Sequence, residues 1–138
     1  MSSIFWARLH GAATHFPIAF IFGAGLFDAL GFFCSSKQHE FRIASYWLLV
    51  LSSIGSFGAM FSGLAASKWN ACGRGLLLQH HLFVWPAFAL IVGLTSWRVA
   101  LGDSPSKRAF AIYLSIIAIT CVLVGAAGFT GGELLLGH

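Results

Sequence analysis

The sequence predicts an all-α fold, a transmembrane four-helix bundle of up-down-up-down order with both termini on the same, outer side. Its mean hydropathy is +0.85, and 58% of its residues are hydrophobic while 9% are charged. This composition is unusual for a soluble domain and typical of helices that contact lipid. Four windows carry no Asp, Glu, Lys or Arg, and each is close to or above the ~20 residues that cross a hydrocarbon layer. They are Leu9–Phe27, Ile43–Ser67, Gly75–Trp97 and Ala109–Gly132.

Each window predicts one helix of a single domain that covers residues 1–138. The first helix is expected over about 14–34, because Thr14 can cap its start and Pro17 is tolerated in a first turn. The second and third helices are expected over about 44–66 and 76–97, on either side of a polar connection. The last is expected over about 109–129, ending before the Gly131–Gly132 pair.

The cations predict the orientation of the bundle in the membrane. The first and third connections carry more of them than the opposite end of the bundle does. By the positive-inside rule these two connections are cytoplasmic, which places both termini on the outer side of a bacterial inner membrane. The first group comprises Lys37, Arg42, Arg98, Lys107 and Arg108, and the second comprises Arg8, Lys68 and Arg74.

The histidines give the clearest functional signal. If all four helices cross, an even number of crossings separates five of the six, so these five collect at the outer face. Imidazoles are costly in lipid and seldom gather there without a ligand. His39 lies among charged residues on the other side and is interpreted as solvated. The five are His10, His15, His80, His81 and His138.

The deeper histidines predict a b-type haem. His15 and the His80–His81 pair begin different helices at similar depth, and diagonal helices of a bundle stand roughly 14 Å apart. This gap suits two imidazoles that approach one iron from opposite sides, the usual axial ligands of haem b. Neighbouring helix residues point about 100° apart, so only one of His80 and His81 is expected to ligate with His15.

His10 and His138 lie farther out and predict a second, shallower site. A second haem is expected there, with a copper or zinc ion as the alternative, because imidazole suits all three. The remaining interpretation is that both are polar residues of the membrane interface. Asp28 is the only acid inside a predicted span, and its expected roles are a cap, an ion pair with Arg42 or Arg108, a subunit contact or proton movement.

Other function classes find little support. No Cys-x-x-Cys or Cys-x-x-Cys-His motif exists, which argues against a thiolate zinc site and covalent haem attachment. The net charge of +4 is interpreted as orientation and contact with anionic lipid rather than nucleic-acid binding. No serine or cysteine triad is recognised, which favours an electron-transfer subunit over an enzyme. Two alternatives stay open: an accessory structural subunit of a membrane redox complex, and a protein that binds copper or zinc through its outward histidines.

Four segments resemble the DUF2231 family, small bacterial membrane proteins with four helices. They are HGAATHFPIAF, FDALG, SYWLLV and GGELLLGH. Gly11 stands where the family often has proline, and the sequence stops at His138 where others continue. The family's association with Rieske and cytochrome components implies redox work at the outer face. The resulting hypothesis is a membrane cytochrome that passes electrons between a quinone and a periplasmic carrier or partner redox subunit.

Overall fold

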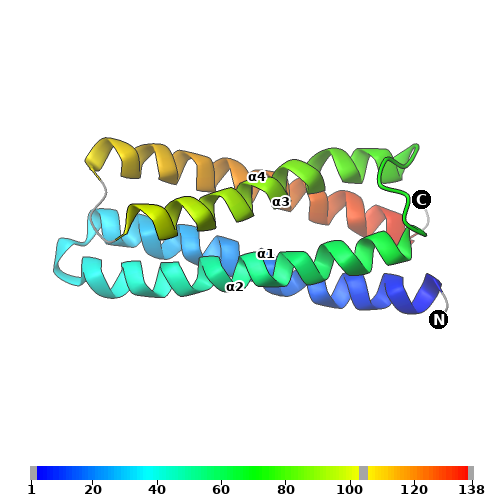
Figure 1. Ribbon diagram of the computed structural model, residues 1–138, viewed down its shortest axis with the longest axis horizontal. Coiled ribbons are helices and arrows are strands. Elements are labelled where there is room, and N and C mark those ends of the chain that lie inside the picture. Colours follow the sequence, from blue (N-terminus) through cyan, green and yellow to red (C-terminus); the bar gives the residue numbers. More distant parts are fainter. Residues whose placement is uncertain (1–2, 103–105, 137–138) are drawn as a thin grey trace.

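Four long helices make up almost all of the molecule (Figure 1). The structure is a computed structural model that describes residues 3–102 and 106–136, and these residues contain no strand. The predicted all-α four-helix fold is therefore confirmed. The helices are α1 (Ser3–Phe33), α2 (Gln38–Ala66), α3 (Leu76–Leu101) and α4 (Lys107–Leu136), with a short 3₁₀ helix, η1 (Ser35–Lys37), between α1 and α2.

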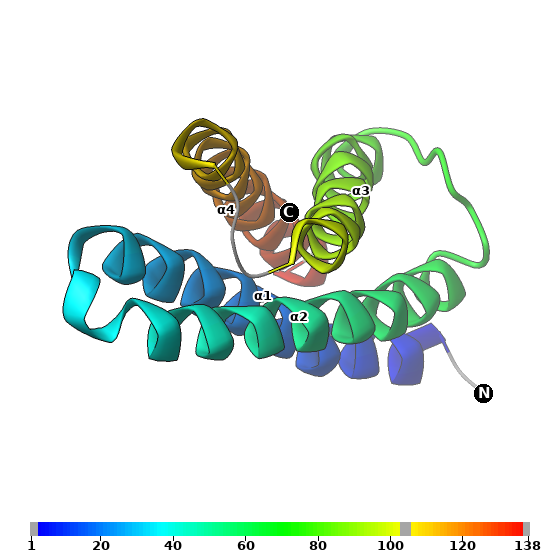
Figure 2. The same ribbon diagram turned by 60° about the vertical axis from the view of Figure 1, so that its left-hand side comes forward.

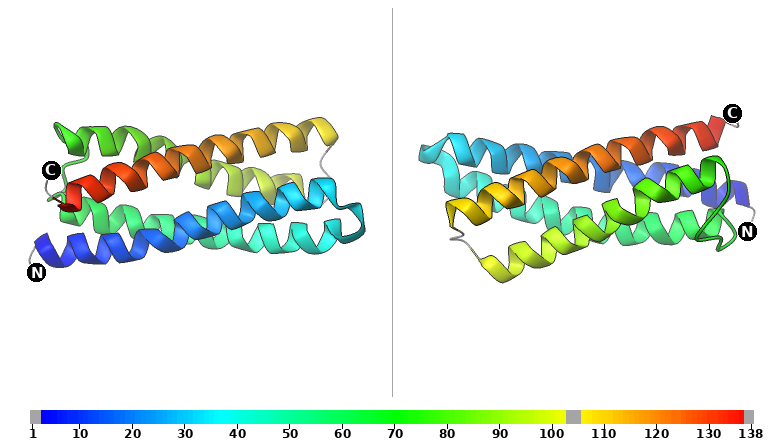
Figure 3. Two further views of the ribbon diagram at one scale, coloured as in Figure 1. Left: turned by 180° about the vertical axis from the view of Figure 1, so that it is seen from behind. Right: turned by 90° about the horizontal axis from the view of Figure 1, so that it is seen from above.

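All four helices are long and apolar enough to cross a membrane. Large apolar side chains remain exposed along their outer faces, among them Phe22, Leu26 and Ile119, as expected where lipid covers the surface. The first and last described residues, Ser3 and Leu136, lie at the same end of the bundle as the α2–α3 connection (Figures 1 and 3). We call this end the histidine end and the other, which holds η1, the η1 end.

The helices extend beyond the charge-free windows that predicted them. α1 begins at Ser3 rather than near Thr14, so Thr14 and Pro17 both lie inside the helix. Thr14 Oγ1 donates a hydrogen bond to the Gly11 carbonyl (2.9 Å), the usual bond of a hydroxyl within a helix, rather than capping a helix start. A charge-free window is interrupted by any charged residue, whereas α1 continues past Arg8 and begins at Ser3.

The bundle is built from two helical hairpins, α1–α2 and α3–α4. Each helix packs mainly against its partner in the hairpin, and in Figure 2 the α1–α2 hairpin lies below α3 and α4. Small residues allow this close packing, because Ser52 Oγ of α2 reaches the Pro17 carbonyl of α1 (2.9 Å). Apolar side chains from all four helices, including Ile21, Leu49, Ile91 and Ile117, form the core between them.

The two hairpins repeat one pattern of inward-facing residues. In α1 and α3 the repeated positions include a histidine near the start and a charged residue near the end. In α2 and α4 they include small or hydroxylated residues. The equivalent positions of α1 and α3 are His10 and His80, Ile21 and Ile91, Ala24 and Leu94, and Asp28 and Arg98. The equivalent positions of α2 and α4 are Ser45 and Tyr113, Leu49 and Ile117, Ser52 and Thr120, Ala59 and Ala127, and Ser62 and Thr130.

Candidate functional site

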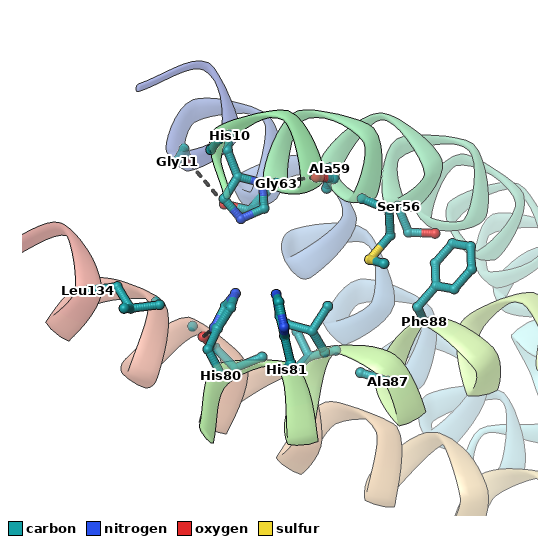
Figure 4. Close-up of a pocket in the computed structure, with 18 of the residues that line it drawn as sticks. His10, Gly11, Ser56, Ala59, Gly63, His80, His81, Ala87, Phe88 and Leu134 are labelled. Atoms are coloured by element: carbon teal, nitrogen blue, oxygen red, sulfur yellow. Dashed lines mark hydrogen bonds between the residues drawn. The ribbon is translucent and has the colours of Figure 1, made fainter. Parts of the chain in front are cut away.

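A cavity of about 560 Å³ opens at the histidine end, lined by residues from all four helices. Its walls are mostly apolar, and four histidines line it: His10 and His15 from α1, and His80 and His81 from α3. In Figure 4, His10 enters from one side while His80 and His81 enter from the other. The volume lies within the ~300–1,000 Å³ range usual for small-molecule and cofactor sites.

His10 is fixed against α2 by its own hairpin. Its Nδ1–H donates to the Ala59 carbonyl (2.9 Å), and the Ser62 hydroxyl lies 3.3 Å from the same nitrogen. The ring lies directly over Gly63, where a Cβ atom would come within 2.9 Å of the His10 Cε1 atom. Glycine at this position therefore lets the imidazole lie flat against the partner helix.

His80 is held by α4 in the same way. Its Nδ1–H donates to the Ala127 carbonyl (3.0 Å), and the Thr130 hydroxyl lies 3.2 Å from that nitrogen. A Cβ at Gly131 would come within 3.1 Å of the His80 Cε1 atom. The two hairpins thus present one imidazole each through an equivalent carbonyl, hydroxyl and glycine.

These hydrogen bonds determine which ring nitrogen can bind a metal. A carbonyl only accepts, so Nδ1 of both His10 and His80 carries the hydrogen and Nε2 keeps its lone pair. The two ring centres lie 6.3 Å apart with the ring planes at 88°. A metal at about 2 Å from a ring nitrogen lies roughly 3 Å from the ring centre, so two opposed rings that share one ion stand roughly 6 Å apart. The observed separation matches this spacing.

His81 is more deeply buried than His10 and His80, with 9% of its surface exposed. Its ring centre lies 6.0 Å from that of His80 and 6.3 Å from that of Trp85. Its Nδ1 atom is buried and has no hydrogen-bond partner. Although neighbouring residues on a helix point in different directions, both His80 and His81 line the cavity, and His80 is the one opposite His10.

The structure places His10, rather than His15, opposite His80. The His15 side chain is exposed, and its Nδ1–H donates to the Gly11 carbonyl of its own helix (2.6 Å). The pairing differs from the predicted one because α1 begins at Ser3, which brings His10 into the helix at the depth of His80. His138, the predicted partner of His10, lies outside the described residues. His39 is exposed at the η1 end.

A second polar layer crosses the bundle near the η1 end. Asp28 of α1 is fully buried, and its Oδ2 atom accepts hydrogen bonds from the hydroxyls of Tyr113 (2.8 Å) and Ser45. Its Oδ1 atom lies 3.3 Å from Nη1 of Arg98. The cation that pairs with Asp28 in the structure is Arg98, whereas the sequence indicated Arg42 and Arg108 as candidates. Arg98 belongs to α3, which continues to Leu101, rather than to the following connection.

The repeat is the sequence signal that would have found both pairs. It places His10 opposite His80 and Asp28 opposite Arg98, since each pair occupies equivalent positions of the two hairpins. Counting charges and histidines by side of the membrane gave the right end of the bundle for these four residues. It carried no information on which side chains face one another.

The match to a known family covers nearly the whole chain. The model of the DUF2231 family, described as a predicted membrane protein, matches residues 7–138, and the chain belongs to this family. The resemblance noted in the sequence is thereby confirmed. Neither a curated protein nor a solved structure matches the chain.

Proposed function

We propose that this protein is a membrane b-type cytochrome, an electron-transfer subunit in which His10 and His80 hold one haem. The observation that carries the proposal is the opposed pair of imidazoles, each fixed through Nδ1 to the backbone of its own hairpin. A histidine ligand that donates its second nitrogen to a carbonyl is the usual arrangement at metal sites, because the bond sets the ring's orientation and basicity. Haem, when bound, supplies one-electron chemistry.

The number of ligands favours haem over a bare metal ion. A macrocycle supplies four nitrogens itself, so two axial imidazoles complete the site. Structural zinc takes four protein ligands and catalytic zinc three. Within the part of the chain that the structure describes, no group of three or more His, Cys, Asp or Glu side chains is placed to hold an ion. The apolar walls of the cavity also suit a flat, largely apolar cofactor.

The role in the membrane follows from where the cavity lies. With the cation-rich η1 end in the cytoplasm, the histidine end faces the periplasm of the bacterial inner membrane. Electrons would then pass between a quinone in the bilayer and a periplasmic carrier or partner redox subunit. Both rings of the pair are partly buried among the helices, which limits the contact of the site with water.

Absorption spectra of the purified protein test the proposal. Protein expressed with haem supply and purified in mild detergent should give a reduced-minus-oxidised spectrum of low-spin haem b. Pyridine haemochrome analysis should give about one haem per chain. Protein without haem that carries stoichiometric copper or zinc in elemental analysis would contradict the proposal in favour of metal binding. Protein that carries neither would favour a structural subunit.

A further inference from the structure

His81 and the deeper part of the cavity lie beyond the His10–His80 pair. Figure 4 shows His81 between the His10–His80 pair on one side and Ser56, Ala87 and Phe88 on the other. Beyond it the cavity continues toward the middle of the bundle. From Leu77 to Ile91 the lining of α3 spans roughly 20 Å at about 1.5 Å per residue.

The hydrogen-bonding atoms around the cavity single out His81. The other polar side chains that line it each have a hydrogen bond within the protein, among them the rings and hydroxyls of Thr14, His15, Ser56 and Trp85. His81 alone in this lining has a buried nitrogen without a partner. A buried polar atom without a hydrogen bond costs free energy, so it indicates a partner that is absent from the isolated chain.

The chemistry of the walls defines that partner. Among the described residues of the lining, none is Asp, Glu, Lys or Arg, which disfavours a charged ligand. Trp85 lies beside His81, and the remaining cavity walls include the aromatic and aliphatic side chains of Phe88, Ile91 and Val124. The ligand that fits is a neutral, lipid-soluble ring with a hydrogen-bonding oxygen and an apolar substituent.

We infer that His81 anchors a membrane quinone in this deeper part of the cavity. The inference rests on the proposed function, for which a quinone is the electron partner. The imidazole Nδ1 donates to a ring carbonyl in the quinone, or accepts from a ring hydroxyl in the quinol. The apolar tail lies along Phe88 and Ile91. Since His81 adjoins His80, the ring would lie next to the proposed haem pair.

Equilibrium binding of a short-tailed quinone tests the inference. The full chain is placed in lipid nanodiscs with radiolabelled decylubiquinone, and empty nanodiscs of the same lipid correct for partitioning. The His81→Phe variant keeps an aromatic ring but has no nitrogen, so its Kd should rise about tenfold or more, the effect of one hydrogen bond. The His81→Gln variant retains an amide donor and should stay within about threefold of the wild type. The control is His39→Ala, an exposed change at the η1 end, which should leave the Kd unchanged.

Haem spectra of the same four preparations separate the two proposals. All four should show the same spectrum, because His10 and His80 are intact in each. Equal quinone affinity in all four preparations would overturn the inference whatever the spectra show, and would mean that an apolar chain alone occupies the cavity. Absence of haem from all four, with His81→Phe still weakening quinone binding, would contradict the proposed function and support the quinone site.

Discussion

At the scale of single residues, two glycines allow the imidazoles to oppose each other. Gly63 and Gly131 each lie beneath one histidine ring, and neither position has room for an unadjusted methyl group. The hydrogen bonds from Nδ1 to Ala59 and Ala127 then fix each ring against rotation. The position of the two imidazoles therefore depends on glycines and backbone carbonyls that would not themselves contact the metal.

Replacing Gly63 by alanine should weaken haem binding. The added Cβ would lie 2.9 Å from the His10 ring, which must tilt away from α2 and lose its hydrogen bond to Ala59. Loss of such a supporting contact typically costs about 10–100-fold in metal affinity. The matched control is Gly58→Ala in the same helix, where a Cβ meets nothing within 4 Å. Haem titration of the apoprotein gives both affinities, and equal affinities in the two variants would contradict this role of Gly63.

At the scale of elements, two polar layers cross the bundle, and each hairpin contributes one residue of the central pair in each layer. His10 and His80 meet at one level, and Asp28 and Arg98 at the other, with Ser45 and Tyr113 beside the ion pair. The histidine layer is symmetric, whereas the charged layer has opposite charges at equivalent positions. The Asp28–Arg98 pair thus favours association of the two different hairpins over two like ones.

Exchanging the two charges tests this interpretation. The single changes Asp28→Arg and Arg98→Asp each place like charges opposite one another in a buried site, and each should cost about 3–5 kcal/mol. The double variant restores an ion pair and should recover a large part of that loss. Unfolding of the detergent-solubilised protein by SDS measures the stabilities, with Lys107→Asp, an exposed change at the same end, as control. A double variant no more stable than the two singles would contradict the interpretation.

The sequence predicted the elements well and their contacts poorly. Windows without charges locate the apolar centre of each helix, because a charge in hydrocarbon is costly. They do not show where a helix ends, so α1 was expected to start near Thr14 and Arg98 was assigned to a connection. As a result, the sequence predicted a pair of His15 with His80 or His81, whereas the structure places His10 opposite His80. It also indicated Arg42 and Arg108, rather than Arg98, as partners of Asp28. Which residues face one another depends on the rotation of each helix about its axis. The repeat between the two hairpins shows this rotation, whereas assigning residues to one side of the membrane does not.

At the scale of the whole molecule, two native cysteines report the orientation. Cys72 is exposed in the α2–α3 connection at the histidine end, and Cys34 is exposed beside η1 at the other. If the η1 end faces the cytoplasm, as proposed, a membrane-impermeant thiol reagent added to intact spheroplasts should label Cys72 alone. Cys34 should react only after permeabilisation and serves as the internal control. Labelling of Cys34 in intact cells, with Cys72 protected, would reverse the orientation.

Haem spectra of four single-histidine variants test the proposed His10–His80 ligand pair. Wild-type protein and each variant are purified identically, and the low-spin bis-histidine spectrum and haem content are compared. His10→Ala and His80→Ala should each abolish the low-spin spectrum, because each removes one of two opposed ligands. His15→Ala and His39→Ala should retain it with about one haem per chain. A full bis-histidine spectrum in His10→Ala, together with its loss in His15→Ala, would contradict the His10–His80 pairing.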